Sequence, residues 1–304
     1  MRQEIIYNLS HNGIIKGYKW EIDNPKGIVV IAHGMAEHIL RYDEFANALN
    51  ENNYTVYGHN HRGHKDSILS DSDYGYMDDE DNFNILVKDL KEIIDKIILD
   101  NPKTPIFLFG HSMGSFVSQR FIELYGNKLN GVILCGSSKN PNSLNKMGLF
   151  LSKIIMKAKG RRHRSKFIDK VAFGSYNKKI KNKRTDFDWL SRDNNEVDKY
   201  IEDKYCGGIF TVSYFHDLSK GFIEISQNFD LIPKNLPILI ISGDKDPVGG
   251  YGKYVTNLYK TLNNIDIKDL ELILYKDARH ELLKETSKLQ THLDVIKWLN
   301  KKVN

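Results

Sequence analysis

The sequence predicts an α/β fold: a mostly parallel central sheet, helices on both faces and an inserted helical cap. Short apolar runs alternate with segments of helical periodicity, which is the pattern of successive β-α units. One such run, 106–109, leads directly into a G-x-S-x-G turn at 110–114. The alternation stops near Ser137 and resumes near Pro237. A chain of 304 residues has room for such a core and an insertion.

The predicted elements follow in order along the chain. Residues 2–9 and 14–22 are expected to form an antiparallel hairpin around Asn12-Gly13, because this dipeptide favours a tight turn. Before the insertion we expect strand 27–32, helix 41–52, strand 54–58, helix 82–99, strand 105–109, helix 112–125 and strand 131–135. After it we expect strands 237–242 and 270–275, with helices behind them. Residues 1–137 and 229–304 would then form the core, and 138–228 the cap.

The turn at 110–114 reads Gly110-His111-Ser112-Met113-Gly114. With a strand before it and a helix after it, this pattern is typical of a nucleophile elbow, which lifts a serine hydroxyl above the end of the sheet. Glycines suit the two outer positions because a turn this tight leaves no room for a Cβ. Ser112 is therefore the candidate nucleophile.

A nucleophilic serine needs a base, and the base needs an acid to orient it. His280 follows the last predicted strand and is the candidate base, whereas His292 lies in an amphipathic terminal helix and is expected at the surface or core edge. Asp244 and Asp246 both follow the preceding strand. We favour Asp246, because Pro247 holds it in an extended conformation.

Such a site also needs backbone N–H groups to bind the developing oxyanion. One is expected from Met113, which follows the nucleophile, and one from Met35, in the loop after strand 27–32. The side chain of His33 is expected to hold this loop by hydrogen bonding. No metal or organic cofactor is expected.

These motifs resemble those of the α/β-hydrolase superfamily, and within it the bacterial lysophospholipase and monoacylglycerol lipase group, which is similar to serine aminopeptidase S33. The resemblance covers nearly the whole chain and rests on 33–34, 60–64, 110–114, 243–248 and His280, with cap segments 173–177 and 188–193. It implies a carboxylic ester hydrolase with Ser112, Asp246 and His280 as its triad and lysophospholipid or monoacylglycerol as substrate. Two positions depart from the family pattern: Asn60 replaces an Asp and Lys65 replaces a Gly.

Other functions remain open at this point. A small-ester carboxylesterase would share the triad. An S33-type aminopeptidase would need an acid in the cap to hold the free amine, and the candidates are Asp186, Asp188, Asp193 and Glu196. A haloalkane dehalogenase would need an Asp nucleophile, so Ser112 argues against this function. A non-catalytic ligand-binding or membrane-binding module on the same fold is the alternative from another class.

Composition points to a cytoplasmic protein. No apolar run approaches 18 residues, so no transmembrane helix is expected. Residues 1–7 are expected to start the first strand, because they lack the apolar stretch of a signal peptide. The two cysteines, Cys135 and Cys206, lack metal-ligand spacing and are expected to be reduced and buried.

The predicted cap is strongly basic. Between Lys139 and Arg184 there are 15 Lys or Arg and one acid, Asp169, a net charge of +14, so the rest of the +5 chain sums to −9. An apolar stripe recurs there at helical spacing: Met147, Phe150, Leu151, Ile154, Ile155 and Ala158. The cap could be a solvated basic face with this stripe packed inward, a surface that contacts anionic membranes, or a pocket for an anionic substrate. Nucleic acid is not expected as a partner, because no recognition motif accompanies the basic residues.

Overall fold

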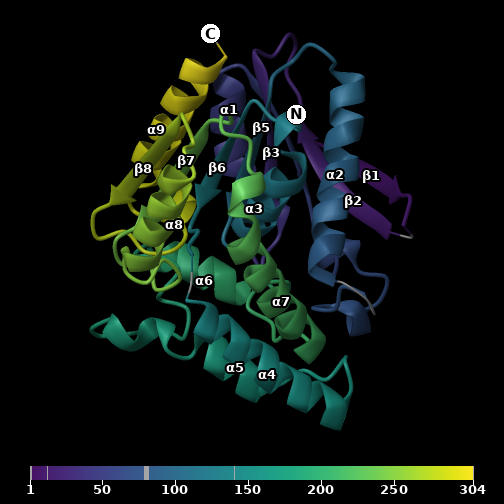
Figure 1. The fold of residues 1–304 in the computed structure, drawn as a ribbon, viewed down its shortest axis with the longest axis vertical. Helices are drawn as coiled ribbons and strands as arrows, with labels where there is room; N and C mark the ends of the chain where they lie inside the picture. Colours follow the sequence, from purple (N-terminus) through teal and green to yellow (C-terminus); the bar gives the residue numbers. More distant parts are fainter. Residues whose placement is uncertain (1, 12, 79–81, 140, 304) are drawn as a thin grey trace.

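A single eight-stranded sheet forms the centre of the protein, which we describe from a computed structural model covering residues 2–11, 13–78, 82–139 and 141–303 (Figure 1). Its strand order is β1-β2-β4-β3-β5-β6-β7-β8. The first three of these strands pair antiparallel, and the other pairs are parallel. The strands are β1 (Arg2–Leu9), β2 (Gly13–Trp20), β3 (Gly27–Ala32), β4 (Tyr54–His59), β5 (Ile106–His111), β6 (Gly131–Cys135), β7 (Ile238–Gly243) and β8 (Leu270–Tyr275).

Helices cover both faces of this sheet, as the alternating sequence predicted. The helices are α1 (Asp43–Glu51), α2 (Asn82–Asp100), α3 (Met113–Tyr125), α4 (Asn142–Lys159), α5 (Lys166–Phe173), α6 (Asn194–Glu202), α7 (Val212–Asn228), α8 (Lys253–Asn264) and α9 (Lys288–Lys302). One apolar core lies between the sheet and α2, α3 and α8. The second lies between the sheet and α1 and α9. Fully buried strands such as β3 and β5 supply side chains to both cores.

The predicted elements are confirmed with small shifts at their ends. The expected helix 41–52 begins as a short 3-10 turn, Ile39–Tyr42, before α1. The hairpin forms with Leu9 opposite Gly13, while Asn12 of its expected turn lies outside the described residues. In the described ranges, no helix is long and apolar enough to cross a bilayer.

The inserted segment lies beyond the sheet and carries α4 to α7 (Figure 1). Its helix α7 also joins the larger core, because Tyr214, Phe215 and Leu218 are buried there. Helix α4 packs along α7, and α5 packs on α4. One of the interpretations left open above has the apolar stripe of α4 packed inward. The structure contradicts it in part, because Met147, Phe150 and Ile154 are about half exposed or more.

Candidate active site

Ser112 occupies the sharp turn between β5 and α3 with backbone angles φ 50° and ψ −120°. A non-glycine residue at positive φ is strained and persists only where its surroundings impose it. A Cβ on Gly110 would lie 2.3 Å from Ser118 Oγ, and one on Gly114 would lie 2.0 Å from the carbonyl of Ala32. Both glycines are therefore required for the close approach of strand and helix, as expected for a nucleophile elbow.

His280 and Asp246 meet behind this turn. The Nδ1–H of His280 donates to Oδ2 of Asp246 over 3.0 Å, and both side chains are almost completely buried. Asp246 also accepts from the Val248 N–H at 2.8 Å and from Ser242 Oγ at 3.3 Å. These bonds fix the carboxylate in one orientation.

Asp244, the other candidate acid, lies elsewhere. Its Oδ1 accepts from the Asp277 N–H at 2.8 Å and lies 3.2 Å from Lys245 Nζ. It therefore holds the turn after β8 and is not brought to the histidine.

The elbow and the histidine are adjacent. The His111 ring, on the residue before Ser112, lies 4.9 Å from the His280 ring, and its Nε2 is 3.4 Å from the His280 carbonyl. Gly136 leaves room for the histidine, because a Cβ there would lie 2.9 Å from His280 Cε1. In the described part of the chain the Ser112 hydroxyl has no hydrogen-bond partner, and Ser112 lines a cavity.

Two backbone N–H groups belong to residues that line the same cavity as Ser112: Met113, which follows it in the elbow, and Met35, in the loop after β3. Within the described ranges, neither the Met35 N–H nor the Met113 N–H has a hydrogen-bond partner. The residues on either side of Met35 are hydrogen-bonded: the Gly34 N–H donates to Glu37 at 2.6 Å, and the Ala36 N–H donates to His64 Nε2 at 3.3 Å. A Cβ on Gly34 would lie 3.2 Å from Ser112 Cβ, so this loop runs beside the elbow.

Sequence reasoning missed Glu37, which organises the loop. Its buried carboxylate accepts from Gly34 N–H, from Tyr42 at 2.8 Å and from His111 Nδ1 at 3.1 Å. Burial alone would raise the pKa of Glu37, but the hydrogen bond from His111 and the charge of Arg41 hold it well below its usual range. Burial likewise opposes charge on His111, yet its bond to Glu37 raises the His111 pKa.

Arg41 extends this network to the loop of His280. It pairs with both carboxylate oxygens of Glu281 at 2.5 and 2.6 Å and with Glu37 at 2.8 Å. A bidentate pair of this kind fixes direction as well as distance. Since Glu281 follows His280 directly, the pair links the loop after β3 to the loop after β8.

The inserted segment is also hydrogen-bonded to the His280 loop. The N–H groups of His280 and Glu281 donate to the carbonyls of Trp189 and Leu190 at 3.4 and 2.7 Å. Arg279 donates to the carbonyls of Asp188 and Ser191 at 2.6 and 2.8 Å. Residues 188–191 are therefore joined by four hydrogen bonds to the loop that carries the histidine.

A cavity of about 510 Å³ opens above Ser112. Its walls are mostly apolar and come from the elbow, from α4, α5 and α7, and from the loop after β7. Both Met35 and Met113 line it together with Ser112. No acidic side chain of the described residues lines it.

Comparison with known proteins places the chain in a family. The model of the serine aminopeptidase S33 family matches residues 23–287. The chain belongs to this family. It is 26% identical to the monoglyceride lipase of Rattus norvegicus over 277 residues, covering 86% of this chain and 77% of that protein.

Two further relatives cover nearly the whole chain. It is 26% identical to the monoacylglycerol lipase of Mycolicibacterium smegmatis over 292 residues, which are 92% of this chain and 90% of that protein. The crystal structure of a highly thermostable carboxyl esterase from Bacillus coagulans, in complex with glycerol, has a TM-score of 0.91 at 25% identity. That match covers 100% of this chain and 99% of the esterase.

The two departures from the S33 family pattern fall on residues with structural roles. Asn60 Oδ1 accepts the Ile39 N–H at 3.0 Å, so its amide oxygen binds the start of the 3-10 turn. Lys65 has φ 37°, a left-handed conformation that explains why glycine is usual there. Neither side chain lines the cavity.

Four buried histidines form a cluster beside the loop after β3, and three of them belong to the sequence motifs at 33–34 and 60–64. They are His33, His59, His61 and His64. His33 donates from Nδ1 to the Gly34 carbonyl at 2.7 Å and accepts the His61 N–H at Nε2, which confirms its expected role in holding the loop. In the described residues, neither ring nitrogen of His59 or His61 has a partner. Burial lowers the pKa of His59 and His64 to about 4, and that of His33 and His61 well below its usual range.

These histidines predict a loss of stability in mild acid. Between pH 6.5 and about 4 the unfolded chain binds protons that the folded chain excludes. The free energy of unfolding therefore decreases as the pH is lowered through this range. The slope is about 1.4 kcal/mol per pH unit for each such histidine. Urea unfolding from pH 7.5 to 5.5 should therefore show a steep fall below pH 6.5. His59→Gln should reduce this slope by the contribution of one histidine, about 1.4 kcal/mol per pH unit. His163→Gln, in the inserted segment, should not reduce it. Equal slopes in the wild type and both variants would contradict the prediction.

Proposed function

We propose that this protein hydrolyses single-chain lipid esters, monoacylglycerol or lysophospholipid, through an acyl-enzyme on Ser112. One observation carries the proposal: a buried His280–Asp246 pair lies beside a strained elbow serine at the base of a mostly apolar cavity. The volume of about 510 Å³ is in the range of small-molecule sites. The lipase and esterase relatives support the same reaction class.

Each group has a role in the proposed reaction. Ser112 Oγ attacks the ester carbonyl, and Nε2 of His280 takes its proton. Asp246 holds the imidazole by its bond to Nδ1 and stabilises the imidazolium. The N–H groups of Met35 and Met113 bind the oxyanion, because no protein acceptor in the described ranges competes for them. His280 then protonates the leaving alcohol and later activates water to release the fatty acid.

An aminopeptidase activity is disfavoured by the cap acids. Asp188 accepts from the backbone of Arg184 and from Thr185, Asp193 caps α6, and Glu196 pairs with Lys199. None of them, nor exposed Asp186, lines the cavity. A free α-amine bound near Ser112 would therefore meet no carboxylate of the described residues.

Substrate panels test this proposal. We expect hydrolysis of long-chain p-nitrophenyl esters, a monoacylglycerol and lysophospholipids, with little turnover of amino-acid p-nitroanilides. Activity confined to short esters would keep the Ser112 reaction and contradict the lipid substrate. Turnover of the anilides at a comparable kcat/KM would favour the peptidase instead.

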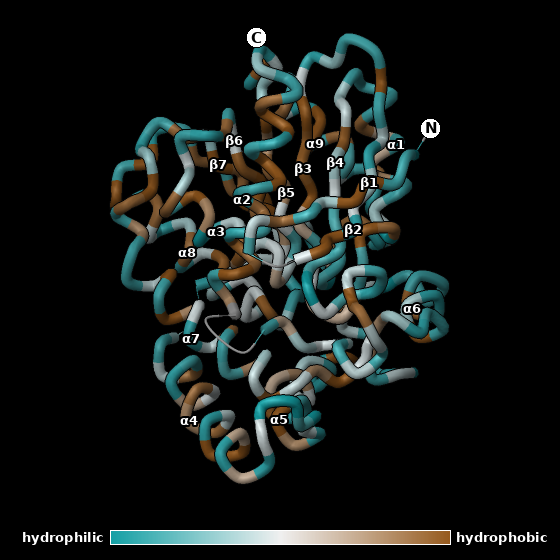
Figure 2. The backbone as a smooth tube through the Cα atoms, turned by 90° about the vertical axis from the view of Figure 1, so that its right-hand side faces the viewer, coloured by the Kyte–Doolittle hydropathy of each residue, from teal (hydrophilic) through white to brown (hydrophobic). Residues whose placement is uncertain are grey.

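We further propose that residues 138–228 form a cap whose basic face contacts anionic lipid. Helices α4 and α5 lie at the end of the molecule farthest from the sheet and alternate hydrophobic and hydrophilic residues (Figure 2). Four apolar side chains there, Phe150, Ile154, Phe167 and Val171, are 42–63% exposed. Apolar side chains among lysines suit an interfacial helix, and Leu144, Met147 and Val171 of the same helices line the cavity.

Vesicle sedimentation tests this contact. Binding to phosphatidylglycerol vesicles should exceed binding to phosphatidylcholine vesicles and should fall as salt rises. Replacing exposed Lys153 and Lys157 by alanine should weaken binding about 30-fold, at roughly 1 kcal/mol per lysine. The matched pair Lys297→Ala and Lys301→Ala on α9 should leave it unchanged. Equal losses in both pairs, or binding that salt does not affect, would count against the basic cap.

A further inference from the structure

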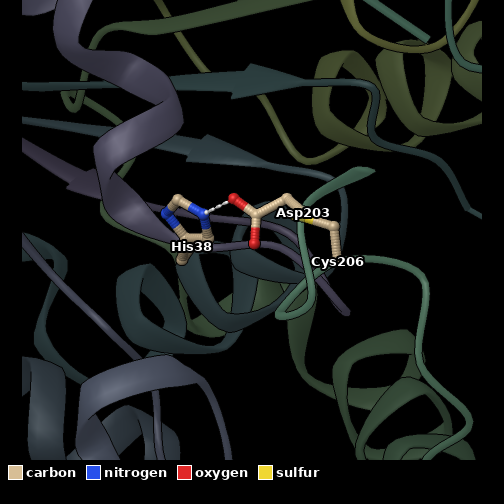
Figure 3. A group of neighbouring side chains, drawn as sticks. All are labelled: His38, Asp203 and Cys206. Atoms are coloured by element: carbon tan, nitrogen blue, oxygen red, sulfur yellow. Dashed lines mark hydrogen bonds and ion pairs between the residues drawn. The ribbon is translucent and has the colours of Figure 1, made fainter. Parts of the chain in front are cut away.

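A second cluster of side chains joins the core to the inserted segment, outside the proposed catalytic groups. His38 ends the loop that carries Met35, and Asp203 and Cys206 lie just after α6 (Figure 3). His38 is buried, whereas Asp203 and Cys206 are half-buried. His38 lies 165 positions before Asp203 in the sequence, so the cluster forms only in the folded chain.

The geometry of the cluster is well defined. His38 Nε2 lies 2.7 Å from Oδ2 of Asp203 (Figure 3), and one ligand atom from each of the three residues lies within 4.8 Å of the other two. The turn after α6 fixes the two cap residues. The Tyr205 N–H donates to Asp203 Oδ1, and the Cys206 N–H donates to the Asp203 carbonyl, both at 2.9 Å.

An imidazole nitrogen, a carboxylate oxygen and a thiolate sulfur are the three side-chain ligands that zinc takes in proteins. Zn–N and Zn–S bonds of about 2.0 and 2.3 Å put neighbouring ligands of a tetrahedral ion roughly 3.3–3.8 Å apart. To reach this spacing, the widest separation, up to 4.8 Å, has to contract by about 1 Å. The His38–Asp203 pair has to open from 2.7 Å by about 0.6 Å, so the ion replaces their hydrogen bond. The partly exposed carboxylate leaves a side open for ion entry and for a water as fourth ligand.

The charges also balance. One carboxylate and one thiolate neutralise a divalent ion, while His38 binds as neutral imidazole. Arg41 and Lys65 act on the cluster with positive charge, and Glu37 and Glu281 act on it with negative charge. Metal selectivity comes from the ligand types: a soft thiolate and an imidazole favour zinc, whereas magnesium and calcium prefer oxygen ligands.

We propose that His38, Asp203 and Cys206 form a zinc site that clamps the cap to the loop after β3. The segment already meets this loop through two bonds to the Ala36 carbonyl, from Gly207 N–H and from the Tyr200 hydroxyl, both at 2.9 Å. A bound ion adds three bonds at the same junction. The site is structural and takes no part in the proposed ester hydrolysis.

Titration calorimetry of the EDTA-treated protein with zinc chloride tests the site. We expect one zinc per chain, and cobalt in its place should give a thiolate-to-metal charge-transfer band. Cys206→Ser should abolish the band and weaken zinc binding at least tenfold, and His38→Gln and Asp203→Asn should weaken it similarly. Zinc should raise the Tm of the wild-type protein and not that of Cys206→Ser.

Cys135→Ser is the matched control, because that thiol is buried on β6 and belongs to no such cluster in the described residues. It should bind zinc as the wild type does. Thermal unfolding in EDTA shows whether each variant folds, so a loss of binding can be separated from misfolding. Unchanged zinc affinity in the folded Cys206→Ser protein, or a cobalt complex without the thiolate band, would overturn the proposal. Neither readout uses hydrolysis, so the result is independent of the proposed enzymatic activity.

Discussion

Replacing Ser112 by alanine is expected to lower kcat/KM for ester hydrolysis by at least about 10³-fold. The change removes the only atom that can form the acyl-enzyme in the proposed reaction. Binding and the oxyanion N–H groups remain, so the residual rate measures what they supply alone. The steady-state rate on a long-chain p-nitrophenyl ester and labelling by a fluorophosphonate probe give two independent measurements.

The same substitution should leave the fold intact. The Ser112 hydroxyl has no hydrogen-bond partner in the described residues, so alanine removes no internal contact of that atom. Ser226→Ala is the matched control, because this serine lies on α7 and does not line the cavity. The control should label and hydrolyse like wild type. A Ser112→Ala protein that keeps more than one-thousandth of the wild-type activity would remove the nucleophile assignment.

Asp246→Asn is also expected to have a large effect, about 10⁴-fold in kcat by analogy with the same change in serine-protease triads. The carboxylate accepts the Nδ1–H of His280 and leaves Nε2 free to act as a base. An asparagine can present an NH₂ group to Nδ1, which favours the wrong tautomer. The loss should appear mainly in kcat, because Asp246 does not line the cavity.

Asp244→Asn is the control for this experiment, since both aspartates follow β7 within three residues. Asp244 accepts one backbone N–H of the turn after β8 and is one-third exposed. Its replacement should therefore change kcat by a few-fold at most. If Asp244→Asn were the more damaging change, the acid of the triad would have to be reassigned to Asp244.

Local sequence patterns were sufficient for the sheet and for the candidate reacting groups. Ser112 and His280 follow buried strands, and parallel strands bring their carboxyl ends to one edge of a sheet. Asp246 and Asp244 could be separated only in part, because two residues of chain decide which carboxylate turns toward the histidine. The bond at 3.0 Å comes from the fold of the whole loop.

The supporting network could not be predicted in the same way. Glu37 contacts His111, 74 residues away, and Arg41 contacts Glu281, 240 residues away. No periodicity or spacing encodes such pairs. The apolar stripe of α4 shows a related limit: periodicity identifies residues that share a face, but it does not say what covers that face. Phe150 and Ile154 share the face and remain exposed.

The two backbone bonds from the His280 loop to Trp189 and Leu190 have a consequence for the dynamics of the protein. The amide protons of His280 and Glu281 can exchange with solvent deuterium when these two bonds to the inserted segment open. Their protection factors therefore report the free energy of that opening. Separation of residues 189–190 from the core is therefore expected to be coupled to displacement of the loop that carries His280.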